Sequence, residues 1–396
     1  MLVDKRKVIV LGTHSFLDGG LKVGIQYLAE GLAHRGWQVD YVATASSPFD
    51  TWGRKRHGRL KRVWLTGQDR YGVAIAEGLT EYAFKAFFPA HRALMRARWQ
   101  LAWNLWLAPS WLGERPYELC VHETSPNVVY WPLAASKCVV FRLSDSPAGF
   151  AHDLPSLIIQ QFESHLAANA YDDIWAVSTP LAQYALLANH QSRLAVIPNG
   201  VADVFGQQAV NVMRKPNSAV FLGGLSHWID DRLIDEVARC LPHWSFDLYG
   251  PVSHVLRFDS PNVRVHPPVA RALVPGLLAG YEVGLIPFRD CDNRMQFVER
   301  PLKFYEYVSA GLGVASTDIG NLRTGMGDLA SYGNTPAEFA KAVVNAQADA
   351  GRKSPSFRQD FMMRHSWSSV MDRFMERIEH LGCASTDLPV QSGERQ

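Results

Sequence analysis

The chain has 396 residues, more than one hydrophobic core usually organises, so two domains are expected. Hydrophobic residues make up 47% of the chain and charged residues 20%, which is typical of a globular protein. The 40 Lys and Arg residues against 38 Asp and Glu residues leave a net charge of +2. This balance argues against a dedicated nucleic-acid-binding protein, which needs a surplus of basic residues.

The cysteines and the first residues of the chain bear on its compartment. The five cysteines are widely spaced without a C-x-x-C pair, so reduced thiols are favoured over a disulfide framework or a zinc site. The first residues lack the apolar core and cleavage site of a signal peptide. No uncharged apolar run reaches the roughly 18 residues that a membrane-spanning helix needs. We therefore expect a cytoplasmic protein.

The first half of the chain alternates between strand and helix patterns. A β-branched apolar run from Val8 to Gly12 predicts a buried strand. Helical spacing of apolar residues follows from Lys22 to Arg35 and ends at Gly36, and residues 39–43 predict the next strand. Such a β-α-β unit implies parallel strands with helices on both faces of the sheet. Further strands are predicted at residues 62–66, 119–122, 138–143, 174–177 and 194–197.

A second strand-helix series follows a stretch with little periodicity. Its strands are predicted at residues 219–223, 245–249, 263–266, 282–286 and 313–316. The chain is therefore predicted to be an α/β protein with two doubly wound, Rossmann-like domains facing across a cleft. The predicted organisation is a first domain at 1–198, a linker at 199–217, a second domain at 218–350, helices at 351–382 and a disordered tail at 383–396.

The strongest chemical signal is the segment from Arg300 to Gly311. Pro301 opens a predicted helix, whose free first-turn N–H groups attract anions. Lys303 adds a positive charge suited to a diphosphate, and Glu306 lies one turn further, where a carboxylate can accept both hydroxyl protons of a ribose. The alternative is an amphipathic helix with a solvated Lys–Glu pair, because such pairs are common.

The stretch from Tyr281 to Asp318 resembles the nucleotide-sugar signature of the GT-B glycosyltransferases of the group-1 type. Other stretches match this family in the expected order: Asp18-Gly19-Gly20, Arg35–Val39, Ile197–Val201, Phe221–Leu225 and His365–Trp367. The resemblance implies the GT-B fold. In that fold an N-terminal domain binds the acceptor, a C-terminal domain binds the nucleotide sugar, and a C-terminal helix returns to the first domain.

The resemblance also implies roles for individual residues. The lysine of the family contacts the diphosphate and the acidic residue contacts the ribose, which assigns these roles to Lys303 and Glu306. Gly19 and Gly20 would form a loop facing the cleft. The full predicted donor site comprises Gly223, Gly224, Ser226, His227, Pro287, Phe288, Pro301, Leu302, Lys303, Glu306 and Tyr307. Asp290-Cys291-Asp292 fits a D-x-D spacing but lies within the donor signature, so no metal or other cofactor is expected.

Proton-transfer residues are predicted where two strands of the first domain end. A sugar hydroxyl needs a carboxylate or an imidazole within hydrogen-bond reach to accept its proton. His122, Glu123 and Asp145 are placed at one rim by strand order. These segments resemble those of the glucuronosyltransferases of xanthan assembly, in which the aspartate is the catalytic base, so Asp145 is predicted to be the base. The alternative is that Asp145 caps the following helix. Ser146 and Pro147 follow Asp145 where those enzymes lead us to expect a second acidic residue, so more than one alignment of this segment with theirs is possible.

Two further segments of the first domain suggest a membrane surface. Residues 54–62 form a basic run, and residues 84–111 interleave Trp and Phe with Lys and Arg. Interfacial helices use this combination among anionic headgroups. The alternative is a core helix followed by a solvated basic loop. Docking on the inner face of the cell membrane would suit a polyprenyl-diphosphate-linked oligosaccharide acceptor.

Together these features predict an inverting glycosyltransferase of bacterial exopolysaccharide biosynthesis. Its donor would be a UDP-sugar, with glucuronic acid as one candidate, whose carboxylate Arg289, Arg294 or Arg300 would neutralise. A retaining transferase that uses an acidic residue near Glu299 is an alternative, as is a sugar-nucleotide 2-epimerase. From another class, an inactive scaffold of a polysaccharide complex is also compatible with the fold.

Overall fold

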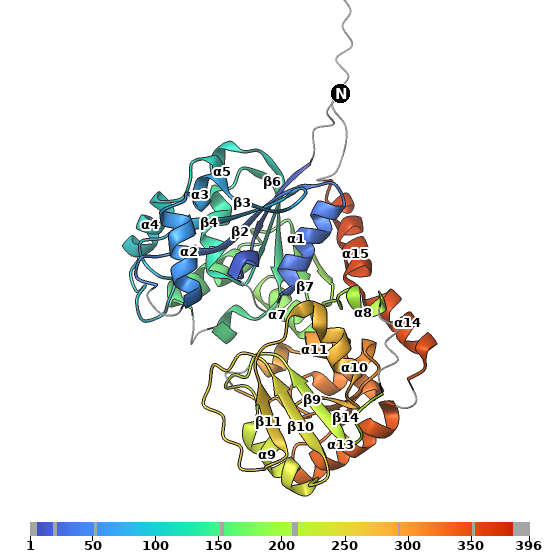
Figure 1. Cartoon of the computed structure of the whole chain (residues 1–396). Helices are drawn as coiled ribbons and strands as arrows, with labels where there is room; N and C mark the ends of the chain where they lie inside the picture. The colour runs from blue at the N-terminus through green and yellow to red at the C-terminus, as the bar shows by residue number, and fades with distance from the viewer. Residues whose placement is uncertain are drawn as a thin grey trace, which may run out of the picture.

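The computed structural model describes residues 6–18, 22–50, 54–150, 154–207, 213–291, 294–350 and 353–382. These residues form two α/β domains, one above the other (Figure 1). The first domain holds an eight-stranded sheet in the order β3-β4-β2-β1-β5-β6-β7-β8, and the second a six-stranded sheet in the order β11-β10-β9-β12-β13-β14. All pairs are parallel except β3 with β4.

The first domain runs from β1 to β8. Its strands are β1 (Lys7–Leu11), β2 (Gln38–Ser46), β3 (Val73–Ala76), β4 (Leu79–Lys85), β5 (Tyr117–Glu123), β6 (Ser136–Leu143), β7 (Asp173–Ala176) and β8 (Leu194–Val196). Its helices are α1 (Gly24–His34), α2 (Arg54–Trp64), α3 (Gln68–Tyr71), α4 (Arg98–Trp106), α5 (Trp111–Glu114), α6 (Ser156–Ala167) and α7 (Thr179–Ala188).

The second domain begins at β9, after the short helix α8 (Val204–Gln207). Its strands are β9 (Ser218–Leu222), β10 (Ser245–Tyr249), β11 (Val263–His266), β12 (Val283–Ile286), β13 (Gly313–Ser316) and β14 (Ser331–Tyr332). Its helices are α9 (Asp231–Cys240), α10 (Val274–Ala279), α11 (Leu302–Ser309), α12 (Leu322–Met326) and α13 (Pro336–Ala350). Two helices follow, α14 (Pro355–His365) and α15 (Trp367–His380).

Strand β1 shows why the first sheet is covered on both faces. Side chains alternate along a strand, so Val8 and Val10 point to one face of the sheet, and Ile9 and Leu11 to the other. The first pair packs in a core cluster with α1 and α15. The second pair packs in a separate cluster that includes α6. All four side chains are fully buried, as expected for a central parallel strand.

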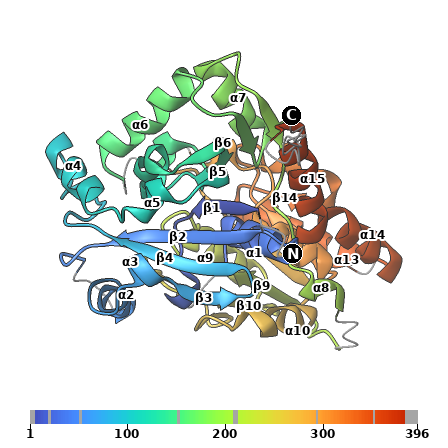
Figure 2. The same cartoon turned by 90° about the horizontal axis from the view of Figure 1, so that it is seen from above.

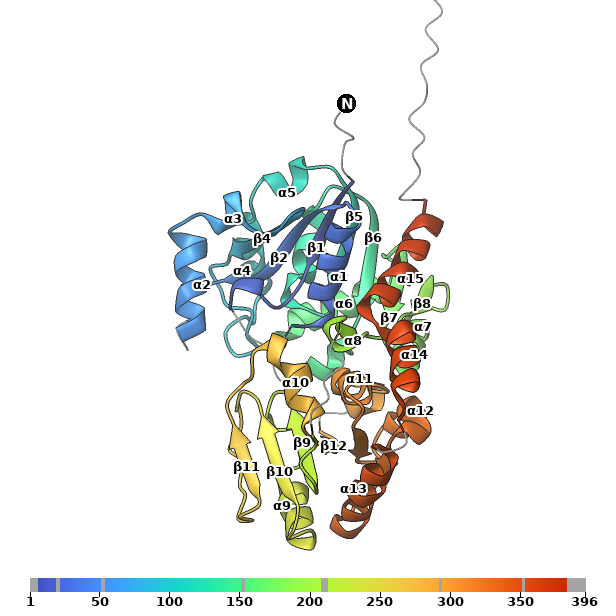
Figure 3. The ribbon, with the colours of Figure 1, turned by 45° about the vertical axis from the view of Figure 1, so that its right-hand side comes forward.

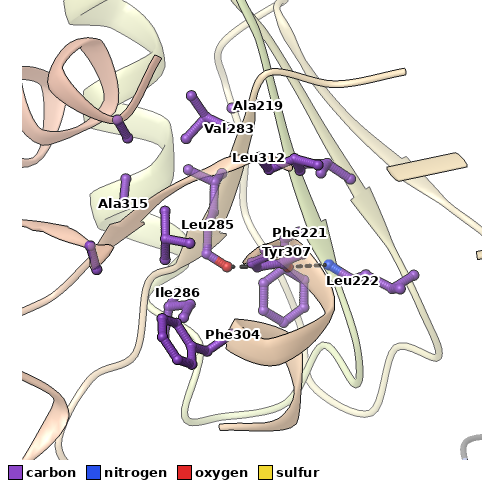
Figure 4. Packing of buried hydrophobic residues seen from close by; sticks show 14 of the residues in the cluster. Ala219, Phe221, Leu222, Val283, Leu285, Ile286, Phe304, Tyr307, Leu312 and Ala315 are labelled. Atoms are coloured by element: carbon purple, nitrogen blue, oxygen red, sulfur yellow. Dashed lines mark hydrogen bonds between the residues drawn. The ribbon is translucent and has the colours of Figure 1, made fainter. Parts of the chain in front are cut away.

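In the second domain, Tyr307 fixes helix α11 on the sheet (Figure 4). Its hydroxyl accepts a hydrogen bond from the Leu222 backbone N–H at 3.0 Å and donates to the Leu285 carbonyl at 3.4 Å. The ring packs on Gly284, where a Cβ atom would lie 2.3 Å from it. Glycine at 284 therefore lets α11 approach β9 and β12 closely.

Helices α14 and α15 run from the second domain up to the first (Figures 1 and 3). Helix α15 packs on α1, with Phe374 against Trp175 at 4.5 Å between ring centroids. Arg377 pairs with Asp173 at 2.6 Å. The prediction of two doubly wound domains with a returning C-terminal helix is therefore confirmed.

One part of the sequence interpretation is wrong. Residues 62–66 were predicted as a strand, but α2 extends through Trp64. The strands at this edge of the sheet are β3 and β4. The sequence of β4 does not alternate between apolar and polar residues, because one of its buried side chains is the carboxyl group of Glu81. That carboxylate accepts hydrogen bonds from the Ser15 hydroxyl and the Phe16 N–H, both at 2.6 Å.

The aromatic stretch at 84–111 is not one helix. It begins in the last residues of β4 and contains the separate helices α4 and α5. Helix α4 lies at the edge of the first domain opposite α15 (Figures 1 and 2). Among the described residues, none of the helices has both the length and the apolar character required to cross a bilayer.

Replacing Phe374 with alanine tests the contribution of α15 to the first domain. The change leaves a cavity against Trp175, so we expect Phe374→Ala to lower the free energy of unfolding by about 3–5 kcal/mol. Leu187→Ala is the control, because this side chain is 89% exposed. Urea unfolding followed by circular dichroism measures both. Equal midpoints for the two variants would contradict the assignment of α15 to the core.

Candidate functional site

A cavity of about 600 Å³ lies between the two domains. Its first-domain wall is formed where β1, β5 and β6 end, and its second-domain wall by the segment after β12 and the start of α11. Ligands of open parallel sheets bind at these carboxyl ends. The lining includes Thr13, Glu123, Arg142, Asp145 and Asn199 on one side, and Phe288, Arg294, Glu299, Arg300, Pro301 and Leu302 on the other.

A buried ion pair organises the first-domain wall. Arg142, whose side chain is 2% exposed, places Nη1 3.4 Å from Glu123 Oε2. Its Nη2 donates to Asn199 Oδ1 at 2.6 Å. Thr13 Oγ1 donates to Glu123 Oε1 at 3.0 Å. Helix α1 can approach only because residue 24 is glycine, since a Cβ there would lie 2.3 Å from Arg142 Nη2.

Asp145 stands in the loop after β6, with its side chain open to the cavity. Its backbone carbonyl accepts a hydrogen bond from Thr124 Oγ1 at 2.7 Å. The enclosing protein raises the pKa of Asp145 to about 6, although Arg294 and Arg142 act in the opposite direction. The helix that follows Asp145 directly is the 3-10 helix Pro147–Phe150, and α6 begins eleven residues after Asp145 with Pro155 as its N-cap, so Asp145 does not cap α6.

Glu123 is the more deeply buried of the two carboxyl groups. Burial raises the pKa of Glu123 to about 7, while Arg142 and the hydrogen bond from Thr13 lower it and Asp145 raises it. The two carboxyl groups therefore differ in accessibility and ionisation at neutral pH. Asp145 is mostly ionised and open to a ligand, whereas Glu123 is held inside the wall.

The structure does not bring His122 to the cavity. Alternation along β5 directs Glu123 to the cavity and His122 to the opposite face of the sheet. The His122 ring stacks on Phe141 at 4.8 Å between centroids. Burial lowers the pKa of His122 to about 3, so it stays neutral. Its surroundings are those of a core residue.

The second-domain wall includes the start of α11. Pro301 is the N-cap of this helix and no side chain caps it, which leaves first-turn N–H groups for a ligand. Pro301 and Leu302 line the cavity. Lys303 Nζ lies 5.1 Å from the ring centroid of Phe221 and 5.0 Å from that of Phe288. Burial lowers the pKa of Lys303 to about 8, and Glu306 acts in the opposite direction.

The glycine loop after β9 lies directly beside Lys303. Gly223 has a φ of +149°, a conformation that favours glycine, and a Cβ on it would lie 3.3 Å from Lys303 Nζ. Gly224 has open space where a side chain would stand. The glycine loop and the ammonium group of Lys303 therefore lie side by side, behind the residues that line the cavity.

Of the other predicted donor residues, Phe288 lines the cavity, whereas Pro287, Ser226 and His227 lie next to residues that line it. Phe288 lines the cavity, and the Pro287 carbonyl accepts a hydrogen bond from the Asp230 N–H at 2.9 Å. Ser226 Oγ lies 3.4 Å from His227 Nδ1, next to Trp228, which lines the cavity.

Two predicted donor residues have protein partners that define their roles, and two predicted cleft residues cannot be placed. Tyr307 lies in the core beneath Leu222 and does not face the cavity (Figure 4). Glu306 is ion-paired with Arg271. Gly19 and Gly20 lie outside the described residues.

Cationic and acidic side chains of the second domain also reach the first. Arg294 and Arg300 line the cavity, whereas Arg289 donates to the His227 carbonyl outside its lining. Arg294 Nε donates to the Gly149 carbonyl at 2.6 Å. Glu299 accepts a hydrogen bond from the Thr179 N–H of α7 at 3.2 Å. Among the described residues, no group of three or more His, Cys, Asp or Glu side chains is arranged to hold a metal ion.

Sequence reasoning missed Arg142, Asn199, Thr13 and Arg271 as members of the site. Arg142 belongs to the same R-x-S-D segment as Asp145, and Asn199 to the P-N-G turn at the domain junction. Both segments resemble those of known glycosyltransferases, so the sequence does contain a signal for these two residues. Arg271 lies in a segment without a motif, and only the folded chain brings it to Glu306.

Comparisons with known proteins show which sequences and folds this chain is similar to. No protein-family model matches the chain. A protein of Bacillus subtilis (strain 168), provisionally described as the teichuronic acid biosynthesis glycosyltransferase TuaH, is 30% identical over 167 residues. That match covers 39% of this chain and 41% of the relative. The matched segment therefore spans about two fifths of the relative's length.

Solved structures match over nearly the whole chain. Sucrose-phosphate synthase from Thermosynechococcus elongatus has a TM-score of 0.70 at 13% identity, covering 96% of this chain and 100% of that one. A glycosyltransferase from Rickettsia africae has a TM-score of 0.63 at 11% identity, covering 96% and 100%. Anabaena HepE, in complex with UDP and glucose, has a TM-score of 0.61 at 15% identity, covering 95% and 100%. The chain has the GT-B fold.

The two carboxyl groups provide a test of the first-domain wall. Because the Asp145 charge raises the pKa of Glu123, we expect Asp145→Asn to move the Glu123 titration to lower pH. Carbon-13 NMR of protein labelled at the glutamate carboxyl measures this, with Glu123→Gln identifying the signal. Asp259→Asn is the control, because that side chain is 91% exposed. An unchanged Glu123 titration in Asp145→Asn would contradict the proximity of the two groups.

Proposed function

We propose that the protein is a glycosyltransferase that transfers a sugar from a UDP-sugar to a lipid-linked oligosaccharide in polysaccharide biosynthesis. The observation that carries the proposal is the interdomain cavity. It has the open carboxyl group of Asp145 on one wall and the uncapped start of α11 on the other. The name of the TuaH relative and the UDP bound to HepE support the polysaccharide context and the donor class.

The second-domain wall would bind the donor diphosphate. N–H groups at a helix N-terminus attract anions, and Lys303 adds a positive charge beside them. With a pKa of about 8, Lys303 is mostly protonated at pH 7. These groups would also stabilise the charge that develops on the leaving diphosphate, which is where preorganised electrostatics accelerate the reaction.

Asp145 would act as the general base. Its carboxylate accepts the proton of the acceptor hydroxyl, while the hydroxyl oxygen attacks the anomeric carbon. The bond from that carbon to the diphosphate breaks, UDP leaves with the electron pair, and the configuration inverts. The base must be ionised, so we expect kcat/KM to fall as the pH drops through about 6.

A retaining reaction would need a different acidic residue, and Glu299 at the cavity is the candidate. Its carboxylate already accepts a hydrogen bond from the start of α7, whereas that of Asp145 is open to the cavity. This difference favours inversion, and NMR of the product anomer distinguishes the two. A uronic acid donor would find Arg294 and Arg300 at the cavity. We propose glucuronic acid as the first donor sugar to assay.

A membrane surface is the second part of the proposal. Helix α4 buries only Asn104, whose side-chain oxygen accepts hydrogen bonds from the N–H groups of Phe87 and Phe88 at 2.8 and 2.9 Å. Trp99, Trp103 and Trp106 are therefore 58%, 52% and 76% exposed. Arg96 and Arg98 are exposed on the same segment. Aromatic and basic side chains together suit anionic headgroups and a peripheral location at the cell membrane.

Two variants separate chemistry from donor binding. We expect Asp145→Asn to lower turnover by about 10²–10⁴-fold while leaving UDP affinity unchanged, because the base does not contact the nucleotide. We expect Lys303→Ala to weaken UDP binding by about tenfold or more, because a charge-assisted contact is lost. Lys341→Ala, at an exposed position of α13, is the control. Calorimetry with UDP and a transfer assay measure both. Full activity in Asp145→Asn would refute the base assignment.

Liposome flotation tests the membrane surface. We expect the wild-type protein to bind vesicles with anionic lipid at low salt, and Trp103→Ala/Trp106→Ala to lose most of this binding, because the exposed indoles of α4 are removed. Leu187→Ala/Leu273→Ala removes exposed apolar side chains elsewhere and serves as the control. Wild-type protein that stays at the bottom of the gradient would remove the membrane proposal.

A further inference from the structure

Glu306 is joined to an arginine that no sequence motif indicated. Arg271 begins the turn at Arg271–Leu273, which follows β11, and its Nη1 is ion-paired with Glu306 Oε1. Its guanidinium lies 5.8 Å from the ring centroid of Phe205. Both side chains are largely buried, so the pair has a defined geometry. In the described part of the chain, no donor is paired with Glu306 Oε2.

A tyrosine of the first domain closes over this pair. Tyr27 lies on α1, and its ring stacks on Trp367 at 4.9 Å with an interplanar angle of 6°. Lys22 Nζ lies 4.1 Å from the same ring. The ring also packs against the core of the second domain. Tyr27 therefore has one orientation, with Arg271 and Glu306 as its charged neighbours.

Two buried polar atoms in this group lack a hydrogen bond of good geometry to the described residues. They are the Tyr27 hydroxyl and Arg271 Nε, which belong to side chains that interact with each other. An unsatisfied buried donor is destabilising, so such atoms need an explanation in a native structure. Here they stand next to a carboxylate that has one oxygen engaged and one available. The arrangement suits a ligand with several hydroxyl groups.

We propose that Arg271 and Tyr27 complete the ribose end of the donor site. Arg271 is a positioning residue: it holds Oε1 of Glu306 and leaves Oε2 for the ribose hydroxyls. Tyr27 adds a hydroxyl from the opposite domain. The inference rests on the proposed donor class, and it has the consequence that both domains contact the nucleoside.

The test compares two nucleotides that differ only in the 2′-hydroxyl. Calorimetry gives the Kd of UDP and of 2′-deoxy-UDP for the wild type, Arg271→Gln and Arg239→Gln. Arg239 pairs with Asp235 on α9 in the same domain and is the matched control. For the wild type and the control we expect 2′-deoxy-UDP to bind about tenfold more weakly than UDP, because a hydrogen bond to a charged group is lost. For Arg271→Gln we expect weaker UDP binding and a ratio below about threefold.

The outcomes separate this inference from the proposed function. A wild-type protein that does not bind UDP would refute the donor class itself. UDP binding with equal affinity for 2′-deoxy-UDP, or an unchanged ratio or tighter UDP binding in Arg271→Gln, would overturn the role of Arg271 alone. If thermal unfolding shows that Arg271→Gln does not fold, Arg271→Lys takes its place, because lysine keeps the charge without the planar contact. A reduced ratio in that variant supports the inference, and a wild-type ratio overturns it.

Discussion

The buried guanidinium of Arg142 is the interaction on which the first-domain wall depends. A charge in a low-dielectric interior is costly unless it is paired and hydrogen-bonded. Arg142 meets this requirement with Glu123 from the neighbouring strand and Asn199 from the domain junction, and it leaves room only for a glycine on α1. One side chain thus connects two strands, the first helix and the point where the chain leaves the domain. The position of Asp145, two residues after β6, follows from this framework.

The segment from Arg294 to Leu302 belongs to the second domain but is held by the first. Arg294 donates to the Gly149 carbonyl, the Phe297 carbonyl accepts from Ser178 Oγ at 2.7 Å, and Glu299 accepts from the Thr179 N–H at the start of α7. The same residues line the cavity. A change in the angle between the domains would therefore alter the wall that faces the ligand. Ligand binding in this cavity would therefore be coupled to the domain arrangement through one set of contacts.

The central strands and the helix that begins after Pro301 could be predicted from the sequence, whereas the edge of the first sheet could not. Central parallel strands such as β1 are continuous apolar runs, and the stretch around Lys303 matches a family signature. β4 contains Glu81, whose burial is explained by hydrogen bonds from Gln68 and from Ser15 and Phe16, the latter two far away in sequence. For a similar reason, the sequence could not show that Tyr307 and His122 lie in the core while other residues of the same helix or strand face the cavity. Which face of a strand or helix meets the cavity depends on packing, and packing at Gly284 or Phe141 is not visible in a motif.

The return of α15 has a consequence for synthesis on the ribosome. Val370, Met371, Phe374 and Ile378 belong to the same core cluster as Val8 and Val10, at the opposite end of the chain. Domains generally acquire their structure as they emerge, the N-terminal part first. The first domain cannot complete its folding in that order, since part of its interior is synthesised only after the whole second domain. Until then the apolar face of α1 has no permanent cover, and a chaperone that shields such surfaces would find its binding site there.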